Sequence, residues 1–216
     1  PKEAHAVKTI VTSDMVDEVA KYHGIKLHSV LTGFKYIGDV IKGLEEKGMA
    51  DSYILGFEES YGYLTGTHVR DKDAVNGAFL IVEMFAYYKT QGISLIQKLN
   101  ELYNKFGFYL NPLDTFTFEG AAGFEKMESI MASFRNSLPE IGGYEVTKVV
   151  DYSKGIDGLP PSDVMKFYLE NGSTVTVRPS GTEPKLKMYC SIKDKNEELA
   201  KKTYEKIKSS LEVKFR

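Results

Sequence analysis

The sequence predicts an α/β protein in two parts: a three-layer α/β/α domain, incomplete at its N-terminal edge, followed by a small α+β domain. Strand-like and helix-like patterns alternate over residues 6–57, which is typical of a parallel sheet covered by helices. After residue 108 strand-like pieces dominate, with hairpin signals and separate helical segments between them. The change between these two secondary-structure patterns places the first domain at residues 1–107 and the second at 108–216.

The first domain should follow a β-α-β-α-β order. Strands are predicted at residues 6–11, 25–31 and 53–57, and the first of them should be buried. Ser13 can cap the first helix and Gly24 can end it, while the second helix begins near Tyr36 and stops at Gly48. Because the chain starts directly on the first strand, we expect the opening elements of this domain to be missing. Ligands of such a sheet bind at the loops that follow the carboxyl ends of its strands.

Two longer helices should complete this domain, the first of them capped by Asp73. Both carry apolar residues at helical spacing. These residues are Val75, Ala78, Phe79, Val82, Phe85 and Ala86 in the first helix, and Leu95, Leu99, Leu102 and Phe106 in the second. The two helices complete the first domain.

The second domain should contain a helix around residues 124–134 and a final helix over 197–211. Strands are predicted at residues 144–150, 164–169, 174–177 and 185–191, and Asn171-Gly172 is typical of a hairpin turn. Strands paired through hairpins, with the helices kept apart from them, indicate an α+β arrangement.

Composition excludes several classes of protein. The formal net charge of -2 gives no field that would recruit nucleic acid or an anionic membrane. The single cysteine, Cys190, excludes an internal disulfide and a Cys-rich metal site, and its strand-like surroundings predict a small core residue. The most apolar stretch, residues 78–88, contains Glu83 and is too short to cross a bilayer. We therefore expect a cytoplasmic protein that binds neither nucleic acid nor membrane.

The motif with the clearest chemistry is Arg-Pro-Ser-Gly-Thr-Glu-Pro at residues 178–184, between two predicted strands. Phosphate binds where a guanidinium, hydroxyl donors and free backbone N–H groups converge. Arg178 offers the guanidinium, Ser180 and Thr182 offer hydroxyls, and Gly181 permits an unusual backbone geometry. Lys187 adds positive charge, provided that it faces the same side. An ordinary turn between strands has the same composition, so the loop by itself leaves both interpretations open.

A second motif, Gly-Phe-Glu-Glu-Ser-Tyr-Gly at residues 56–62, follows the third strand. Glu58 and Ser60 are two residues apart, so in an extended segment they project to the same side. A carboxylate beside a hydroxyl suits a pair of adjacent sugar hydroxyls. A surface turn with solvated carboxylates is the alternative.

Two further segments lie where an α/β sheet presents its ligands. Thr32, Gly33 and Lys35 follow the second strand, although the start of a helix explains them nearly as well. Arg70 and Lys72 precede the long helix and are placed to reach a phosphosugar. An exposed charged loop is the alternative for this second pair.

Together and in this order, these segments resemble the alpha-D-phosphohexomutase superfamily, closest to its bacterial phosphoglucomutase and phosphomannomutase members. The resemblance covers nearly the whole chain and corresponds to most of the family's third domain and all of its fourth. It implies that the 178–184 loop clamps the phosphate of the substrate and that Glu58 and Ser60 hold sugar hydroxyls. It also implies that residues 32–35 sense which end of the sugar is presented, and that Arg70 and Lys72 make basic contacts near the reacting phosphoryl group.

The resemblance further implies reversible exchange between hexose 1-phosphate and hexose 6-phosphate, through a phosphoserine and a bisphosphate intermediate. Family members carry the phosphoserine in a Ser-His-Asn-Pro type loop and bind Mg²⁺ with an Asp-Gly-Asp-x-Asp-Arg loop, and neither string occurs here. We therefore expect Mg²⁺ to bind outside this chain, with glucose 1,6-bisphosphate as activator and intermediate. No metal ligand and no catalytic residue is expected here, apart from a contribution of Lys72. This chain, without the missing N-terminal domains as its partner, should bind phosphosugar but not turn it over.

Other functions stay open at this point. Glucosamine-phosphate relatives usually show Glu-Gln-Ser-Gly-His where residues 58–62 read Glu-Glu-Ser-Tyr-Gly, which argues against an amino sugar. We expect the hexose to be glucose, but the sequence does not settle glucose against mannose, which differs from it at one stereocentre. A free-standing phosphosugar-binding module is a second alternative. The sequence shows no basic groove, which binding of single-stranded nucleic acid through sheet tyrosines would require.

Overall fold

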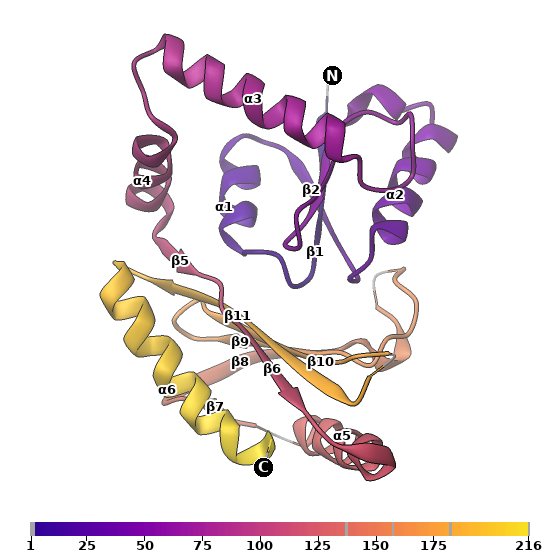
Figure 1. Ribbon diagram of the computed structural model, residues 1–216, viewed down its shortest axis with the longest axis vertical. Helices are drawn as coiled ribbons and strands as arrows, with labels where there is room; N and C mark the ends of the chain where they lie inside the picture. The colour runs from indigo at the N-terminus through magenta and orange to yellow at the C-terminus, as the bar shows by residue number, and fades with distance from the viewer. Residues whose placement is uncertain (1–2, 137, 157, 182, 216) are drawn as a thin grey trace. The chain divides into compact units, whose positions relative to one another are not determined.

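The computed structural model describes residues 3–136, 138–156, 158–181 and 183–215. The chain divides between Phe106 and Gly107 into two compact units, which we call unit 1 and unit 2 (Figure 1). Across the described residues, no helix combines the length and the apolar character that a membrane span needs.

Unit 1 is built on a four-stranded sheet in the order β2-β1-β3-β4. The strands are β1 (His5–Thr9), β2 (Lys26–Val30), β3 (Tyr53–Glu58) and β4 (Gly62–Leu64). β1 pairs in parallel with β2 and β3, as the alternating pattern predicts, and β4 pairs antiparallel with β3. β4 was not predicted, because a strand of three residues is too short to show a period of two.

Helices α1 (Met15–Tyr22) and α2 (Phe34–Glu46) connect the parallel strands, with a short 3-10 turn, η1 (Ala50–Ser52), before β3. The first crossover moves from β1 to one neighbour and the second returns past β1 to the other. The two helices cover opposite faces of the sheet (Figure 1), which is the arrangement that the general right-handed rule predicts for two crossovers in opposite directions. The predicted three-layer α/β/α arrangement is therefore confirmed.

Helices α3 (Ala74–Thr90) and α4 (Leu95–Phe106) form as predicted, but their apolar faces are not in the core. Val75 is 81% exposed, Phe79 68% and Val82 65%, and Gly77 is the one buried residue of α3. α3 contacts β4 closely at Gly77, where a Cβ would lie 3.3 Å from the Cβ of Tyr63. Helical spacing shows which residues gather on a face, whereas burial requires a neighbouring element over that face.

Unit 2 contains a sheet in the order β5-β11-β10-β9-β8-β7, with β6 also paired to β11. All of these pairings are antiparallel. The strands are β5 (Phe108–Leu110), β6 (Leu113–Thr117), β7 (Glu140–Ile141), β8 (Tyr144–Asp151), β9 (Met165–Leu169), β10 (Thr174–Pro179) and β11 (Lys185–Asp194). The helices are α5 (Gly120–Arg135), α6 (Glu197–Phe215) and the short η2 (Tyr152–Lys154).

The core of unit 2 lies between one face of this sheet and the helices α5 and α6 (Figure 1). Val175 and Val177 of β10 belong to this core, so the intervening residues of β10 project from the opposite face. Cys190 is buried in β11, as predicted, and this burial raises the pKa of its thiol. The second domain is therefore α+β, as the sequence indicates.

Adjacent glycines in the β7–β8 hairpin provide a test of this packing. Gly142 and Gly143 both have positive φ, at 63° and 85°. A Cβ on Gly142 would lie 2.8 Å from the backbone of Ile207 in α6, whereas one on Gly143 meets nothing within 4 Å. We expect Gly143→Ala to cost about 1 kcal/mol of unfolding free energy from backbone strain, and Gly142→Ala about 2 to 4 kcal/mol. Equal costs in urea denaturation of the two variants would contradict the packing of α6 on this hairpin.

Candidate functional site

In unit 1, the loops after β1 and β3 meet at the carboxyl ends of the parallel strands. Thr9 Oγ1 donates a hydrogen bond of 3.2 Å to Glu59 Oε2, and the hydroxyls of Thr9 and Thr12 lie 2.9 Å apart. These strands flank the point where the chain reverses its direction of travel across the sheet. This is the position at which open α/β sheets bind ligands.

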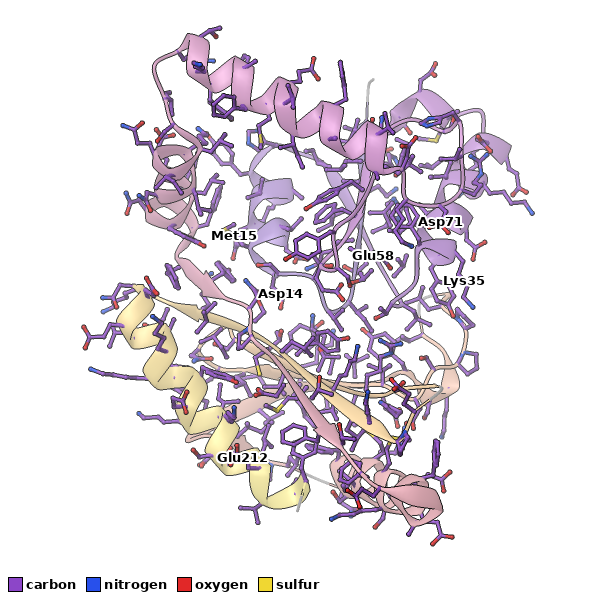
Figure 2. The ribbon with its side chains drawn as sticks, viewed as in Figure 1. Asp14, Met15, Lys35, Glu58, Asp71 and Glu212 are labelled. Atoms are coloured by element: carbon purple, nitrogen blue, oxygen red, sulfur yellow. The ribbon has the colours of Figure 1, made fainter. Side chains whose placement is uncertain are left out.

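Glu58 links the end of β3 to the start of α2. Its Oε1 accepts a hydrogen bond of 3.0 Å from the backbone N–H of Gly33, the residue that precedes α2 (Figure 2). Gly33 has a φ of 125°, a conformation that favours glycine. The positive end of the α2 dipole stabilises the negative charge of the Glu58 carboxylate. The sequence treated residues 32–35 and 58–60 as separate candidates, and the structure brings them together.

Three side chains, one of them Glu58, lie close to Gly62. A Cβ on Gly62 would lie 3.2 Å from Glu58 Oε2, 3.3 Å from Lys72 Cδ and 3.4 Å from Phe34 Cδ2. Lys72 Nζ also lies 5.6 Å from the centre of the Phe34 ring and 3.0 Å from Asp71 Oδ1. Lys72 therefore belongs to the same cluster as Glu58.

The geometric premise that paired Glu58 with Ser60 was wrong. β3 ends at Glu58, and Ser60 lies in the turn that follows, so the two side chains are not neighbours on an extended strand. Glu58 is buried, whereas Ser60 is exposed and donates a hydrogen bond of 3.1 Å to Glu59 Oε1. Both residues nevertheless belong to the β3–β4 hairpin.

Three other predicted residues have distinct surroundings. Thr32 Oγ1 is buried and has no hydrogen-bond partner in the described parts of the chain, so this hydroxyl is a group that a ligand would satisfy. Lys35 is exposed at the start of α2, with its Nζ 4.9 Å from the centre of the Tyr36 ring (Figure 2). Arg70 donates to the carbonyl oxygens of Thr67 and Val69 and to Glu45 of α2, so its guanidinium anchors the loop before α3.

The N-cap assigned to Asp73 is confirmed. Asp73 Oδ1 accepts hydrogen bonds of 2.9 Å and 3.0 Å from the N–H groups of Val75 and Asn76. The bond from the Asn76 N–H, together with the contact to His68, lowers the pKa of the Asp73 carboxyl. This cap fixes where the loop that carries Lys72 ends.

Lys8 is a residue of this region that sequence reasoning missed. It lies in β1, one residue before Thr9, and its side chain is 1% exposed. Its Nζ is paired with Asp14, at 2.9 Å, and with Asp17, both at the start of α1. A lysine is almost never buried without such partners, and the sequence signal that would have found it is a lone cation inside an otherwise apolar strand. The pairing holds the loop between β1 and α1 in place.

In unit 2, the register of β10 and β11 places Arg178 directly opposite Lys187. Directly opposed residues of an antiparallel pair project from the same face, which meets the condition set for Lys187. Both side chains are half-buried, and neither has an ion pair or hydrogen bond to any other part of the chain that the structure describes. Like charges in this arrangement destabilise a sheet, so an anion bound beside the pair would relieve their repulsion.

The loop between these strands fits the expectation only in part. Ser180 is half-buried, and its N–H donates to the carbonyl oxygen of Lys185 at 2.7 Å. Gly181 does not have positive φ, and a Cβ there would meet nothing within 4 Å, so neither the backbone conformation nor the space at this position requires glycine. Thr182 lies outside the described residues.

Thr115 of β6 is a second residue that sequence reasoning missed. It pairs with Lys187 on the other side of β11, so Arg178, Lys187 and Thr115 form one row across three strands. The neighbouring Asp114 anchors β6 by accepting hydrogen bonds from Tyr204 at 2.5 Å and Lys208 at 2.7 Å in α6. No sequence signal could have found Thr115, because the register of β6 on β11 joins residues about seventy positions apart.

Comparisons with known proteins identify the family. Residues 1–106 match the model described as phosphoglucomutase/phosphomannomutase, alpha/beta/alpha domain III, and residues 119–206 match that described as phosphoglucomutase/phosphomannomutase, C-terminal domain. The chain belongs to the phosphoglucomutase/phosphomannomutase family. It corresponds to the third and the C-terminal domain of that family.

Relatives of this family agree with the assignment. The chain is 37% identical over 204 residues to a phosphoglucomutase of Staphylococcus saprophyticus, and 37% identical over 200 residues to one of Staphylococcus aureus. These matches cover 89% and 87% of this chain but only 37% and 35% of the relatives, so the chain spans little more than a third of their length.

Solved structures of the family share the fold. The open form of the Paramecium phosphoglucomutase pp63/parafusin superposes with a TM-score of 0.71 at 22% identity, over 97% of this chain and 37% of that one. A putative phosphomannomutase from Thermus thermophilus gives a TM-score of 0.61 at 18% identity, again over 97% and 37%.

The family resemblance implies Mg²⁺, and the side chains of the described residues determine whether this chain could bind it. Within the described ranges, no three His, Cys, Asp or Glu side chains are grouped so that they could hold an ion. The described residues therefore do not fit the metal.

Gly62 provides a test of the Glu58 cluster. Because a Cβ at Gly62 would crowd Glu58, Lys72 and Phe34, we expect Gly62→Ala to cost about 1 to 3 kcal/mol of unfolding free energy and to speed hydrogen exchange at the Gly33 amide. Gly43→Ala is the control, since a Cβ on this α2 residue meets nothing within 4 Å. The control should gain about 0.5 to 1 kcal/mol through better helix propensity. Unchanged Gly33 exchange in Gly62→Ala would rule out the crowding.

Proposed function

We propose that this chain is the substrate-recognition part of a phosphohexose mutase that interconverts hexose 1-phosphate and hexose 6-phosphate. Unit 2 binds the phosphate of the substrate and unit 1 holds its sugar. The observation that carries the proposal is the opposed pair Arg178 and Lys187, which brings two positive charges together without an acidic partner in the described chain. A phosphate dianion supplies the charge that this pair lacks.

The phosphate site combines several donors. Arg178 presents its guanidinium for two parallel hydrogen bonds, and Lys187 contributes a point charge from the next strand. The hydroxyls of Ser180 and Thr182 complete the clamp at the loop, and Thr115 extends it on the side of β6. Gly181 contributes its backbone N–H.

The sugar site is centred on the β3–β4 hairpin. Glu58 uses Oε1 to hold Gly33, which leaves Oε2 as an acceptor for a sugar hydroxyl. Ser60 donates from the turn, and Lys72 lies beside Gly62, as the Glu58 carboxylate does. A sugar bound to Glu58 would therefore also contact the 32–35 loop, which supports a role for Thr32, Gly33 and Lys35 in reading its orientation. Arg70 supports this site by anchoring the loop that carries Lys72.

The complete reaction needs parts that this chain does not supply. We propose that a phosphoserine, and Mg²⁺ as its charge-neutralising ion, belong to the portion of the relatives that lies outside the match, and that glucose 1,6-bisphosphate is the intermediate. Support comes from the match to the third and C-terminal domains alone. A cytoplasmic location stays a prediction.

The exposed apolar surface of α3 supports the proposal that further polypeptide packs on this chain. Helices that are apolar on all sides are normally buried on all sides. An open groove of about 650 Å³ between α1, α3 and α4 continues this surface. We propose that this surface is covered by a segment equivalent to the part of the relatives that lies outside the match.

Glucose is the hexose that we propose, because the curated relatives described above are phosphoglucomutases. The likeness in fold to a putative phosphomannomutase keeps mannose as the second candidate. A free-standing phosphosugar-binding module would use the same two sites without the rest of an enzyme.

The isolated chain should show no mutase turnover with glucose 1-phosphate, Mg²⁺ and glucose 1,6-bisphosphate, because phosphoryl transfer needs an aligned nucleophile and a metal. Formation of glucose 6-phosphate, followed with a coupled dehydrogenase, measures this. An Arg178→Ala preparation purified in parallel reports contaminating host enzyme. Turnover by the wild-type chain above that level would refute the proposed division of labour.

Arg178→Ala should weaken binding of inorganic phosphate by about 10- to 100-fold, through loss of a charge-assisted bidentate contact. The same change should leave the melting temperature unchanged or raise it in phosphate-free buffer, because it relieves repulsion from Lys187. Lys185→Ala is the matched control, since Lys185 is already paired with Glu183 at 2.9 Å. Calorimetric titration checks both variants, and equal effects of the two substitutions would speak against the clamp.

Glu58→Gln should weaken binding of glucose 6-phosphate by about 10-fold while leaving inorganic phosphate affinity unchanged, because an amide offers one acceptor and mismatches its donor. Titration of wild type and variant with both ligands measures this difference. Should the variant bind glucose 6-phosphate as wild type does, Glu58 acts only as the support of Gly33.

A further inference from the structure

Tyr61 is held in a backbone conformation that its side chain disfavours. Its φ is 62°, and it is the only residue other than glycine with positive φ in the described parts of the chain. Glu58 pairs with Gly62 across the hairpin, which leaves residues 59–61 as a three-residue loop. The third position of such a loop takes the left-handed conformation, and glycine is the residue that fits there without strain.

Nothing within the described chain compensates this strain. The Tyr61 side chain is 88% exposed, the highest value among the large apolar and aromatic side chains that are exposed. It makes no hydrogen bond, ion pair or ring contact with any other described residue. Backbone strain of this kind gathers at ligand-binding sites, where the side chain acts on something outside the chain.

The position of Tyr61 points to the ligand. It lies between Ser60 and Gly62, three residues after Glu58, on the hairpin that carries the proposed sugar contacts. A hexose has hydroxyl edges, which carboxylates and hydroxyls bind, and flatter faces made of C–H groups, which aromatic rings cover. Neither Glu58 nor Ser60 can cover such a face.

We propose that Tyr61 is a sugar-stacking residue, whose ring covers the C–H face of the hexose that Glu58 and Ser60 hold by its hydroxyls. The inference rests on the proposed function and adds a residue to its sugar site. A stacked ring does not read the direction of hydrogen bonds, so it accepts a hexose phosphorylated at either end. This suits a site that must bind both the 1-phosphate and the 6-phosphate.

The test uses the chain as it is, with glucose 6-phosphate as the sugar probe and inorganic phosphate as the probe without a ring. Tyr61→Gly should melt about 2 to 5 °C higher, because the strain is relieved. It should bind glucose 6-phosphate about 3- to 10-fold more weakly and inorganic phosphate equally well. Tyr61→Phe should bind both as wild type does, since it keeps the ring. Tyr87→Ala, which removes an exposed tyrosine from α3, is the control and should also bind both normally.

Three results would overturn the inference: unchanged glucose 6-phosphate binding in Tyr61→Gly, an equal loss in Tyr61→Phe, or parallel losses for both probes. Glu58→Gln separates this failure from that of the proposed function. If Glu58→Gln weakens sugar binding and Tyr61→Gly does not, only the stacking role is wrong. If wild type binds glucose 6-phosphate no better than inorganic phosphate, both the sugar site and the stacking role are wrong.

Discussion

The constraint on which the proposed phosphate site of unit 2 depends is the register of β10 on β11. This register sets Arg178 and Lys187 opposite each other on the face of the sheet that does not enter the core. The energy of the core fixes the register, because a slip by one residue would turn Val175 and Val177 out and the cations in. The repulsion of the two cations is thus maintained by the packing of apolar side chains on the other face.

In unit 1 the main constraint is a close approach, which brings the Glu58 carboxylate to the start of α2. Gly33 adopts a backbone conformation that other residues disfavour, and Gly62 leaves room beside Glu58. A Cβ on Gly56, two residues before Glu58, would lie 2.5 Å from Ile37 Cγ2. Small residues therefore let β3, β4 and α2 approach each other closely, and the candidate sugar site lies where they meet.

Buried and partly buried charges support both sites without belonging to their ligand surfaces. Lys8 binds Asp14 and Asp17 and so fixes the loop that follows β1. Asp114 accepts from Tyr204 and Lys208 and so fixes β6 beside Lys187. The sequence gives no sign of the pairing between Lys208 and Asp114, which raises the pKa of the Lys208 ammonium, because the two residues are distant in sequence.

The sequence by itself determined the order of strands and helices, the two kinds of domain and the family, because these follow from local periodicity and from short motifs. Tertiary structure alone decided which side chains meet. Glu58 reaches Gly33 rather than aligning with Ser60, Thr115 joins Lys187, and the apolar residues of α3 stay uncovered in unit 1. The physical reason is that strand register, turn conformation and burial depend on contacts between distant segments, whereas helical and strand patterns record only the preferences of neighbouring residues.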